Sequence, residues 1–110
     1  MDGWIGVDLD GTLAEYHEWI HETHIGKPIP LMLERVKLWL AKGIKVKIVT
    51  ARIGHGEIAK NAIEDWCKKH IGIIIPITNQ KDYGMIELWD DRCVQVEPNT
   101  GRRIDGKNLD

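Results

Sequence analysis

The alternation of apolar and polar residues predicts strands and helices that follow one another along the chain. Residues 4–8, WIGVD, form a short apolar run that stops at an aspartate–glycine turn signal, as a buried strand does. Residues 44–50, IKVKIVT, alternate and are rich in β-branched side chains, so they predict a second strand ending at Thr50. Pro76 favours a sheet edge or a strand end. Three further strands are expected, at residues 71–78, 85–90 and 94–97.

Two segments carry apolar residues at helical spacing. The first covers residues 31–43, with Gly43 as its C-terminal stop, and the second covers residues 56–70. The apolar positions are Met32, Val36, Trp39 and Leu40, then Ile58, Ala62, Ile63 and Trp66. Strands that alternate with helices are typical of a parallel sheet covered by helices. The pattern therefore predicts an α/β fold, a three-layer Rossmann-like sandwich with a mostly parallel sheet of about five strands.

Length and composition fit one globular domain over residues 1–110. Hydrophobic residues make up 43% of the chain and charged residues 29%, which is ordinary for a soluble protein. The formal net charge of -2 gives no general attraction to nucleic acid or to an anionic membrane. Cys67 and Cys93 show neither a metal-binding spacing nor a disulfide framework, and no apolar run approaches the ~20 residues that span a bilayer. We expect a cytoplasmic protein with no membrane partner.

Polar side chains are expected at the carboxyl ends of several strands. Asp8 and Asp10 follow the first strand, Thr50 ends the second, and Asp90 and Asp91 follow the fourth. In an open parallel sheet, ligands bind beyond these ends. Four carboxylates in one crevice repel each other unless a cation lies among them, and sites rich in oxygen suit Mg²⁺. The sequence therefore predicts a magnesium site at this edge.

The same residue types suit phosphoryl transfer. An aspartate can attack phosphorus and form an aspartyl-phosphate. A metal ion and a lysine neutralise the charge of the transferring group, and Lys81 lies between the third and fourth expected strands. A neighbouring carboxylic acid can protonate the leaving oxygen and later activate water.

Four short motifs also occur in a definite order. DLDGTL at residues 8–13 is followed by Thr50 in KIVTAR, by the lone Lys81, and by Asp90 and Asp91 in LWDD. Together they resemble the four motifs of the haloacid dehalogenase (HAD) superfamily of phosphohydrolases, the first of which is D-x-D-G-T-L. The intervals between the motifs are too short for the cap domains of that family, so the chain resembles a small capless member.

The resemblance implies a role for each matching residue. Asp8 would be the nucleophile and Asp10 the general acid and base, while Thr50 and Lys81 would hold the phosphoryl oxygens. Mg²⁺ would be bound by Asp8, by the backbone carbonyl of Asp10, and by Asp90 or Asp91. Candidates for substrate binding are Gly11, Thr12, Arg52 and His24. For Arg52, a surface salt bridge is an equally open interpretation.

The expected substrate is a phosphorylated molecule: a nucleotide, a nucleic-acid terminus or a phosphoprotein. An open site of this kind suits large substrates, or can be covered by forming a homo-oligomer. The expected activity is Mg²⁺-dependent hydrolysis of phosphomonoesters. The alternative is an inactive domain that keeps the fold and binds phosphorylated partners.

One further motif competes with this interpretation. HEWIH at residues 17–21 matches the zinc-protease pattern H-E-x-x-H, and His24 follows. On a straight helix His17 and His24 would lie ~10 Å apart along the axis, too far for one zinc ion whose ligands lie ~2 Å away. A zinc hydrolase is therefore disfavoured. A flap over Asp8, in which His21, His24 or Trp19 touches the leaving group, is the preferred interpretation of this segment.

Overall fold

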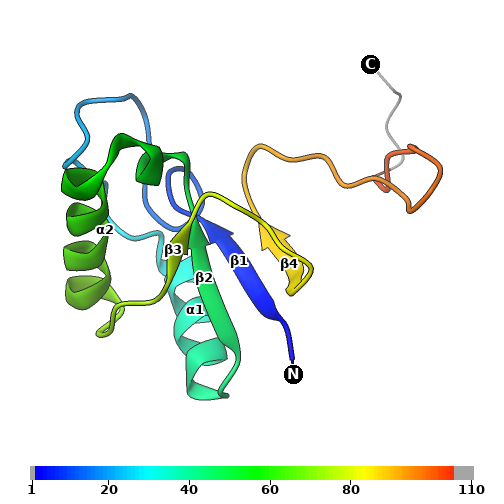
Figure 1. Cartoon of the computed structure of the whole chain (residues 1–110), viewed down its shortest axis with the longest axis horizontal. Coiled ribbons are helices and arrows are strands. Elements are labelled where there is room, and N and C mark those ends of the chain that lie inside the picture. Colours follow the sequence, from blue (N-terminus) through cyan, green and yellow to red (C-terminus); the bar gives the residue numbers. More distant parts are fainter. Residues whose placement is uncertain (1, 106–110) are drawn as a thin grey trace.

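A computed structural model of the chain describes residues 2–105 and contains one parallel sheet with two α-helices (Figure 1). The sheet has four strands in the order β3-β2-β1-β4. In chain order the elements are β1 (Trp4–Asp8), α1 (Pro30–Ala41), β2 (Lys45–Val49), the 3₁₀-helix η1 (Ala51–His55), α2 (Glu57–His70), β3 (Ile77–Thr78) and β4 (Met85–Trp89). The α/β, Rossmann-like fold is confirmed, with four strands in place of about five.

All three strand pairings are parallel. β1 pairs with β2 on one side and with β4 on the other, and β2 pairs with β3. In parallel strands the carboxyl ends meet at one edge of the sheet, so the residues that follow β1, β2 and β4 come together there. This arrangement brings distant parts of the sequence to one place.

Two of the expected strands differ from the structure. The third is confined to Ile77–Thr78, because Gly72 at φ +101° ends α2 and the apolar run after it is largely exposed. Its position at a sheet edge is confirmed. The expected fifth strand, residues 94–97, is wrong: this segment makes a single antiparallel bridge between Val96 and Arg103. It turns back on the segment that follows it and does not join the sheet.

The core lies between the sheet and the two helices. One buried cluster contains Ile5 and Val7 of β1 together with residues of both helices. On α2 the buried positions are Ala59, Ile63, Trp66 and Cys67. Ile58 was expected on this face and is 60% exposed, so that assignment is wrong. Within residues 2–105 no helix is long and apolar enough to cross a membrane.

The two helices pack on one face of the sheet, because residues of both belong to the same buried cluster as Ile5 and Val7, which point to one side of β1. Within residues 2–105 no helix covers the opposite face, so the third layer of the expected three-layer sandwich is not found in this part of the chain. On that face Trp4 is buried by side chains from loops and strands. Its indole N–H donates to Asp82 at 2.9 Å, and the Lys47 ammonium lies 4.4 Å from its ring centroid. Leu88 and Ile86, on the same side of β4, stay partly exposed.

Candidate functional site

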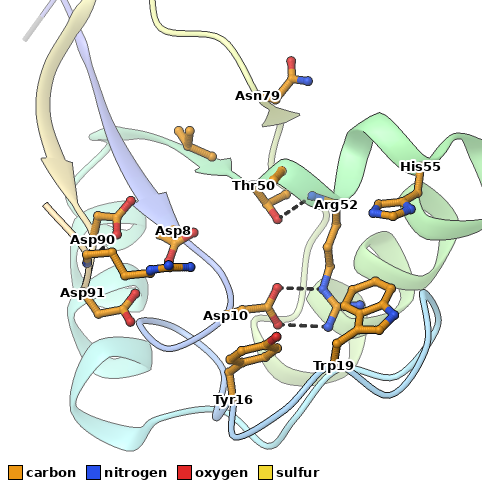
Figure 2. A pocket seen from close by; sticks show the side chains of 13 residues that line it. Asp8, Asp10, Tyr16, Trp19, Thr50, Arg52, His55, Asn79, Asp90 and Asp91 are labelled. Atoms are coloured by element: carbon orange, nitrogen blue, oxygen red, sulfur yellow. Dashed lines mark hydrogen bonds and ion pairs between the residues drawn. The ribbon is translucent and has the colours of Figure 1, made fainter.

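Three carboxylates meet at the carboxyl edge of the sheet. Asp8 is the last residue of β1, and Asp90 and Asp91 follow β4 (Figure 2). One oxygen from each lies within 4.8 Å of the other two. The expectation that these strand ends converge is confirmed for all three residues.

The loop after β1 is held by two buried leucines. Leu9 and Leu13 are fully buried, so the alternate residues Asp8 and Asp10 point toward the open edge. The carbonyl of Leu9 accepts N–H bonds from Thr12, Leu13 and Ala14, which closes a tight turn. The motif DLDGTL thus folds as a short loop that presents its polar side chains on one side.

Gly11 and Thr12 shape the carboxylate cluster. The Thr12 hydroxyl lies 3.0 Å from Asp91 Oδ1 and 3.3 Å from Asp8 Oδ2, and it accepts the N–H of Asp91 at 3.0 Å. Gly11 has φ +88°, and a Cβ at this position would lie 2.5 Å from Asp91 Oδ2. A glycine is therefore favoured both by the backbone conformation and by the carboxylate packed against it.

The three carboxylates perturb one another. Burial raises the pKa of Asp8 to about 7, and a hydrogen bond with Asp91 and the negative charges of Asp90 and Asp91 add to the rise. For Asp91 desolvation acts upward, but hydrogen bonds from Asp8 and Thr12 outweigh it and hold the pKa below its ordinary value. Without a metal ion, Asp8 therefore tends to keep its proton at pH values below about 7, where it can donate a hydrogen bond to Asp91. A cation in this cluster would replace that proton.

Asp10 turns away from this cluster and pairs with Arg52. The guanidinium donates from Nε to one oxygen at 2.7 Å and from Nη2 to the other at 3.0 Å. A third N–H of Arg52 reaches the carbonyl of Glu22 at 3.2 Å. The salt bridge that was one interpretation of Arg52 is therefore present, but it is not at the surface, because the Arg52 side chain is only 5% exposed. Arg52 links the loop after β1, η1 and the segment 15–27.

Thr50 stands at the end of β2 as expected. It is buried, and its side-chain oxygen accepts the N–H of Arg52 at 3.1 Å, which caps η1. Among residues 2–105 we find no acceptor for its hydroxyl proton, which is therefore available to an acceptor in the cavity that Thr50 lines.

A cavity of about 1080 Å³ surrounds these groups. The sequence analysis did not select four of the polar side chains that line it, those of Tyr16, His55, Asn79 and Arg92. Asn79 directly follows β3, so the rule that ligands bind beyond strand ends could have identified it. Tyr16 lies in an irregular segment without periodicity and gave no such signal.

Four expected site residues are not among those that line this cavity: Gly11 and Thr12, which lie against Asp91, and also Lys81 and His24. Lys81 is exposed on the loop between β3 and β4 and is not among the lining residues, so its role stays a prediction. His24 lines a neighbouring hollow of about 380 Å³, which it shares with Asp10 and Arg52. His24 is therefore near the site without contacting the carboxylate cluster.

The segment 15–27 is not helical, so the helix that a zinc-protease motif requires is absent from it. Among residues 2–105 the one group of three or more candidate metal ligands is Asp8, Asp90 and Asp91. His17 and His21 are exposed. The segment instead folds over the site, tied down by the Trp66 indole N–H, which donates to the carbonyl of Gly26 at 2.9 Å.

The donor set of the cluster fits a hard divalent cation. All its ligand atoms are carboxylate oxygens, they lie close enough to share one ion, and they face an open cavity that leaves room for water or phosphate ligands. Asp8, Asp90 and Asp91 are the residues that would hold it. Both Asp90 and Asp91 belong to the cluster, so the expected choice of one of them is not required.

Comparisons with known proteins give information about the fold of this chain but name no activity. No family model matches the chain, and no curated protein matches it. A solved structure described as that of a conserved protein from Bacteroides thetaiotaomicron is similar, with a TM-score of 0.62 and 25% sequence identity. The match covers 86% of this chain and 79% of that one. The similarity supports the α/β architecture, and the description of that protein states no activity.

Proposed function

We propose that the protein is a Mg²⁺-dependent phosphomonoester hydrolase that works through an aspartyl-phosphate on Asp8. The observation that carries this proposal is the convergence of Asp8, Asp90 and Asp91 within 4.8 Å of one another beside a cavity lined by Thr50. Bound Mg²⁺ supplies charge neutralisation for the phosphoryl group and keeps Asp8 ionised. The resemblance of the motifs to those of HAD phosphohydrolases supports the same assignment.

Two displacements make up the reaction. In the first, an oxygen of Asp8 forms a bond to phosphorus while the ester P–O bond breaks, and Asp10 gives a proton to the leaving oxygen. In the second, Asp10 takes a proton from water as the water oxygen attacks phosphorus, which releases phosphate and restores the Asp8 carboxylate. The hydroxyl of Thr50 donates to a phosphoryl oxygen in both steps.

The pair between Asp10 and Arg52 bears on the first step. Both oxygens of Asp10 accept N–H bonds from Arg52, so a proton on Asp10 would displace one of these bonds. The substrate phosphoryl group is itself a strong acceptor for a guanidinium. We expect the substrate phosphate to accept hydrogen bonds from Arg52. Asp10 then loses hydrogen bonds from Arg52 and can carry the proton that it donates as an acid.

The test is hydrolysis of a generic aryl phosphate by the wild type and by Asp8→Asn, each assayed with Mg²⁺ and with a chelator. Turnover should require Mg²⁺ and should fall by at least a thousandfold in Asp8→Asn, because the amide cannot attack phosphorus. Asp65→Asn is the matched control, since it makes the same change on the exposed side of α2. Turnover that survives in Asp8→Asn would overturn the mechanism.

The alternative, a domain that only binds phosphorylated partners, is distinguished by a wider set of substrates and a binding measurement. A wild-type protein without turnover on aryl phosphate or on a panel of nucleotides, oligonucleotides and phosphopeptides, but with Mg²⁺-dependent binding of inorganic phosphate, would favour the binding domain. The observation that favours this alternative is the ion pair between Asp10 and Arg52, because an Asp10 carboxylate held in this pair does not act as an acid.

A further inference from the structure

The cavity beside the carboxylates has an aromatic wall. Tyr16, Trp19 and His55 line the same cavity as Asp8. In Figure 2 Trp19 and His55 lie beyond Asp10 as seen from Asp90 and Asp91. The cavity thus joins a site suited to phosphate with a wall suited to a planar, apolar group.

Trp19 is held as a platform. Its ring stacks on His55 at a centroid distance of 5.3 Å and an interplanar angle of 21°. The buried guanidinium of Arg52 lies 4.9 Å from the Trp19 ring centroid. Both partners belong to η1, so the ring rests on that helix, yet Trp19 remains 47% exposed and Tyr16 43% exposed. Large aromatic rings exposed inside a cavity are ready to stack on a ligand.

We propose that this wall is a base-stacking subsite and that the substrate is a nucleoside monophosphate. The proposal rests on the phosphatase function proposed above. Its base stacks on Trp19 and Tyr16, while its phosphate lies at Asp8. Asn79, on the rim of the same cavity, offers an amide that can hydrogen-bond to a base edge.

Size and charge favour a mononucleotide over a polymer. The cavity of about 1080 Å³ is slightly larger than the usual range for small ligands, which is roughly 300–1,000 Å³. A nucleic-acid strand needs a basic track for its phosphates. The cavity is lined by four carboxylates and two guanidinium groups, and the whole chain has a formal net charge of -2. One phosphate near a bound cation needs no such track.

The test measures binding in the Asp8→Asn protein with Mg²⁺, so that no ligand is consumed. Isothermal titration compares adenosine 5′-monophosphate with ribose 5-phosphate, which has the same sugar and phosphate and a hydroxyl group in place of the base. We expect the nucleotide to bind at least tenfold more tightly, as one stacked base changes affinity by about this factor. Phosphotyrosine is titrated as an aromatic phosphate without a base.

Variants in the same background assign the preference to Trp19. Trp19→Ala should bring the ratio of the two affinities close to one, and Trp19→Phe should keep most of it because a smaller ring still stacks. Tyr83→Ala is the control, since Tyr83 is fully exposed and does not line the cavity. Thermal melting of each variant shows whether it keeps its fold.

The outcomes separate the two proposals. Equal binding of the nucleotide and ribose 5-phosphate, phosphotyrosine binding as tight as the nucleotide, or a ratio that survives in a folded Trp19→Ala protein overturns the base-stacking subsite. Because the titration needs no turnover, a clear preference for the nucleotide supports the subsite even where the wild type hydrolyses nothing. Turnover of aryl phosphate without a preference for the nucleotide would support the phosphatase function and overturn the base-stacking subsite.

Discussion

At the scale of single residues, particular contacts hold the carboxylate cluster in place, and the sequence predicted which carboxylates meet there but not these contacts. Asp8, Asp90 and Asp91 could be placed together because each follows a parallel strand. The contacts of Thr12 could not, because they join residues 79 positions apart through one hydroxyl. Likewise, the spacing of Asp10 and Arg52 in the chain gives no sign of their bidentate pair.

Gly11→Ala should disturb the cluster through a single methyl group. At φ +88° a Cβ is strained, and it would lie 2.5 Å from Asp91 Oδ2, so the Asp91 carboxylate has to move. We expect the free energy of unfolding to fall by about 1–2 kcal/mol and Mg²⁺ binding to weaken severalfold. Urea denaturation and Mg²⁺ titration measure the two effects. Gly54→Ala is the control because its Cβ would meet nothing within 4 Å, and equal behaviour of both variants would contradict the prediction.

The titration of Asp8 should be visible in the stability of the metal-free protein. The pKa of Asp8 rises from 3.8 to about 7 on folding. Between these values the folded protein holds a proton that the unfolded chain has released, so the free energy of unfolding falls as the pH increases through this window. Urea denaturation in chelator at pH 5 and pH 8 measures the fall. It should be smaller in Asp8→Asn, which cannot titrate, and an identical pH dependence in both proteins would speak against the shift.

At the scale of elements, local patterns succeeded where the chain buries one regular face. β1, β2 and both helices were predicted within a few residues, because their inward side chains repeat with the period of a strand or a helix. The apolar run IGIII led to a predicted strand that was too long, since Ile73 and Ile74 are 55% and 43% exposed and only Ile75 is buried. The pattern of residues 94–97 misled as well, because alternation does not show whether a neighbouring strand is available for pairing.

Arg52 should stabilise three segments of the chain by holding them together. It joins the loop after β1, η1 and the segment 15–27 through Asp10 and the carbonyl of Glu22. Arg52→Lys keeps the charge but loses the bidentate geometry, so we expect the free energy of unfolding to fall by about 1–3 kcal/mol.

A double-mutant cycle with Asp10→Asn checks this coupling by chemical denaturation. The double variant should lose less stability than the two single losses added together, because either change alone breaks the same pair. Lys60→Arg in α2 serves as a matched basic control. Strict additivity of Arg52→Lys and Asp10→Asn would show that the pair contributes nothing beyond its separate residues.

At the scale of the whole molecule, one core supports one functional edge. Both helices pack on the same face of the sheet, and the strands beneath them end at the carboxylates. The order β3-β2-β1-β4 sets Asp8 in an inner strand, between the ends of β2 and β4. Repulsion among the carboxylates is therefore linked to the stability of the entire sheet, because moving Asp8 away would require β1 to shift.

Mg²⁺ should accordingly stabilise the molecule as a unit. A cation that binds only the folded state adds about 2.7 kcal/mol at a concentration one hundred times its dissociation constant. For a chain of this size that corresponds to a rise of roughly 10 °C in the melting temperature. Differential scanning calorimetry with Mg²⁺ or with chelator measures the rise, which should be much smaller in Asp90→Asn, where one charge of the cluster is lost, than in Asp65→Asn. A rise of equal size in both variants would show that Mg²⁺ acts on the surface in general, and would place its site away from Asp8, Asp90 and Asp91.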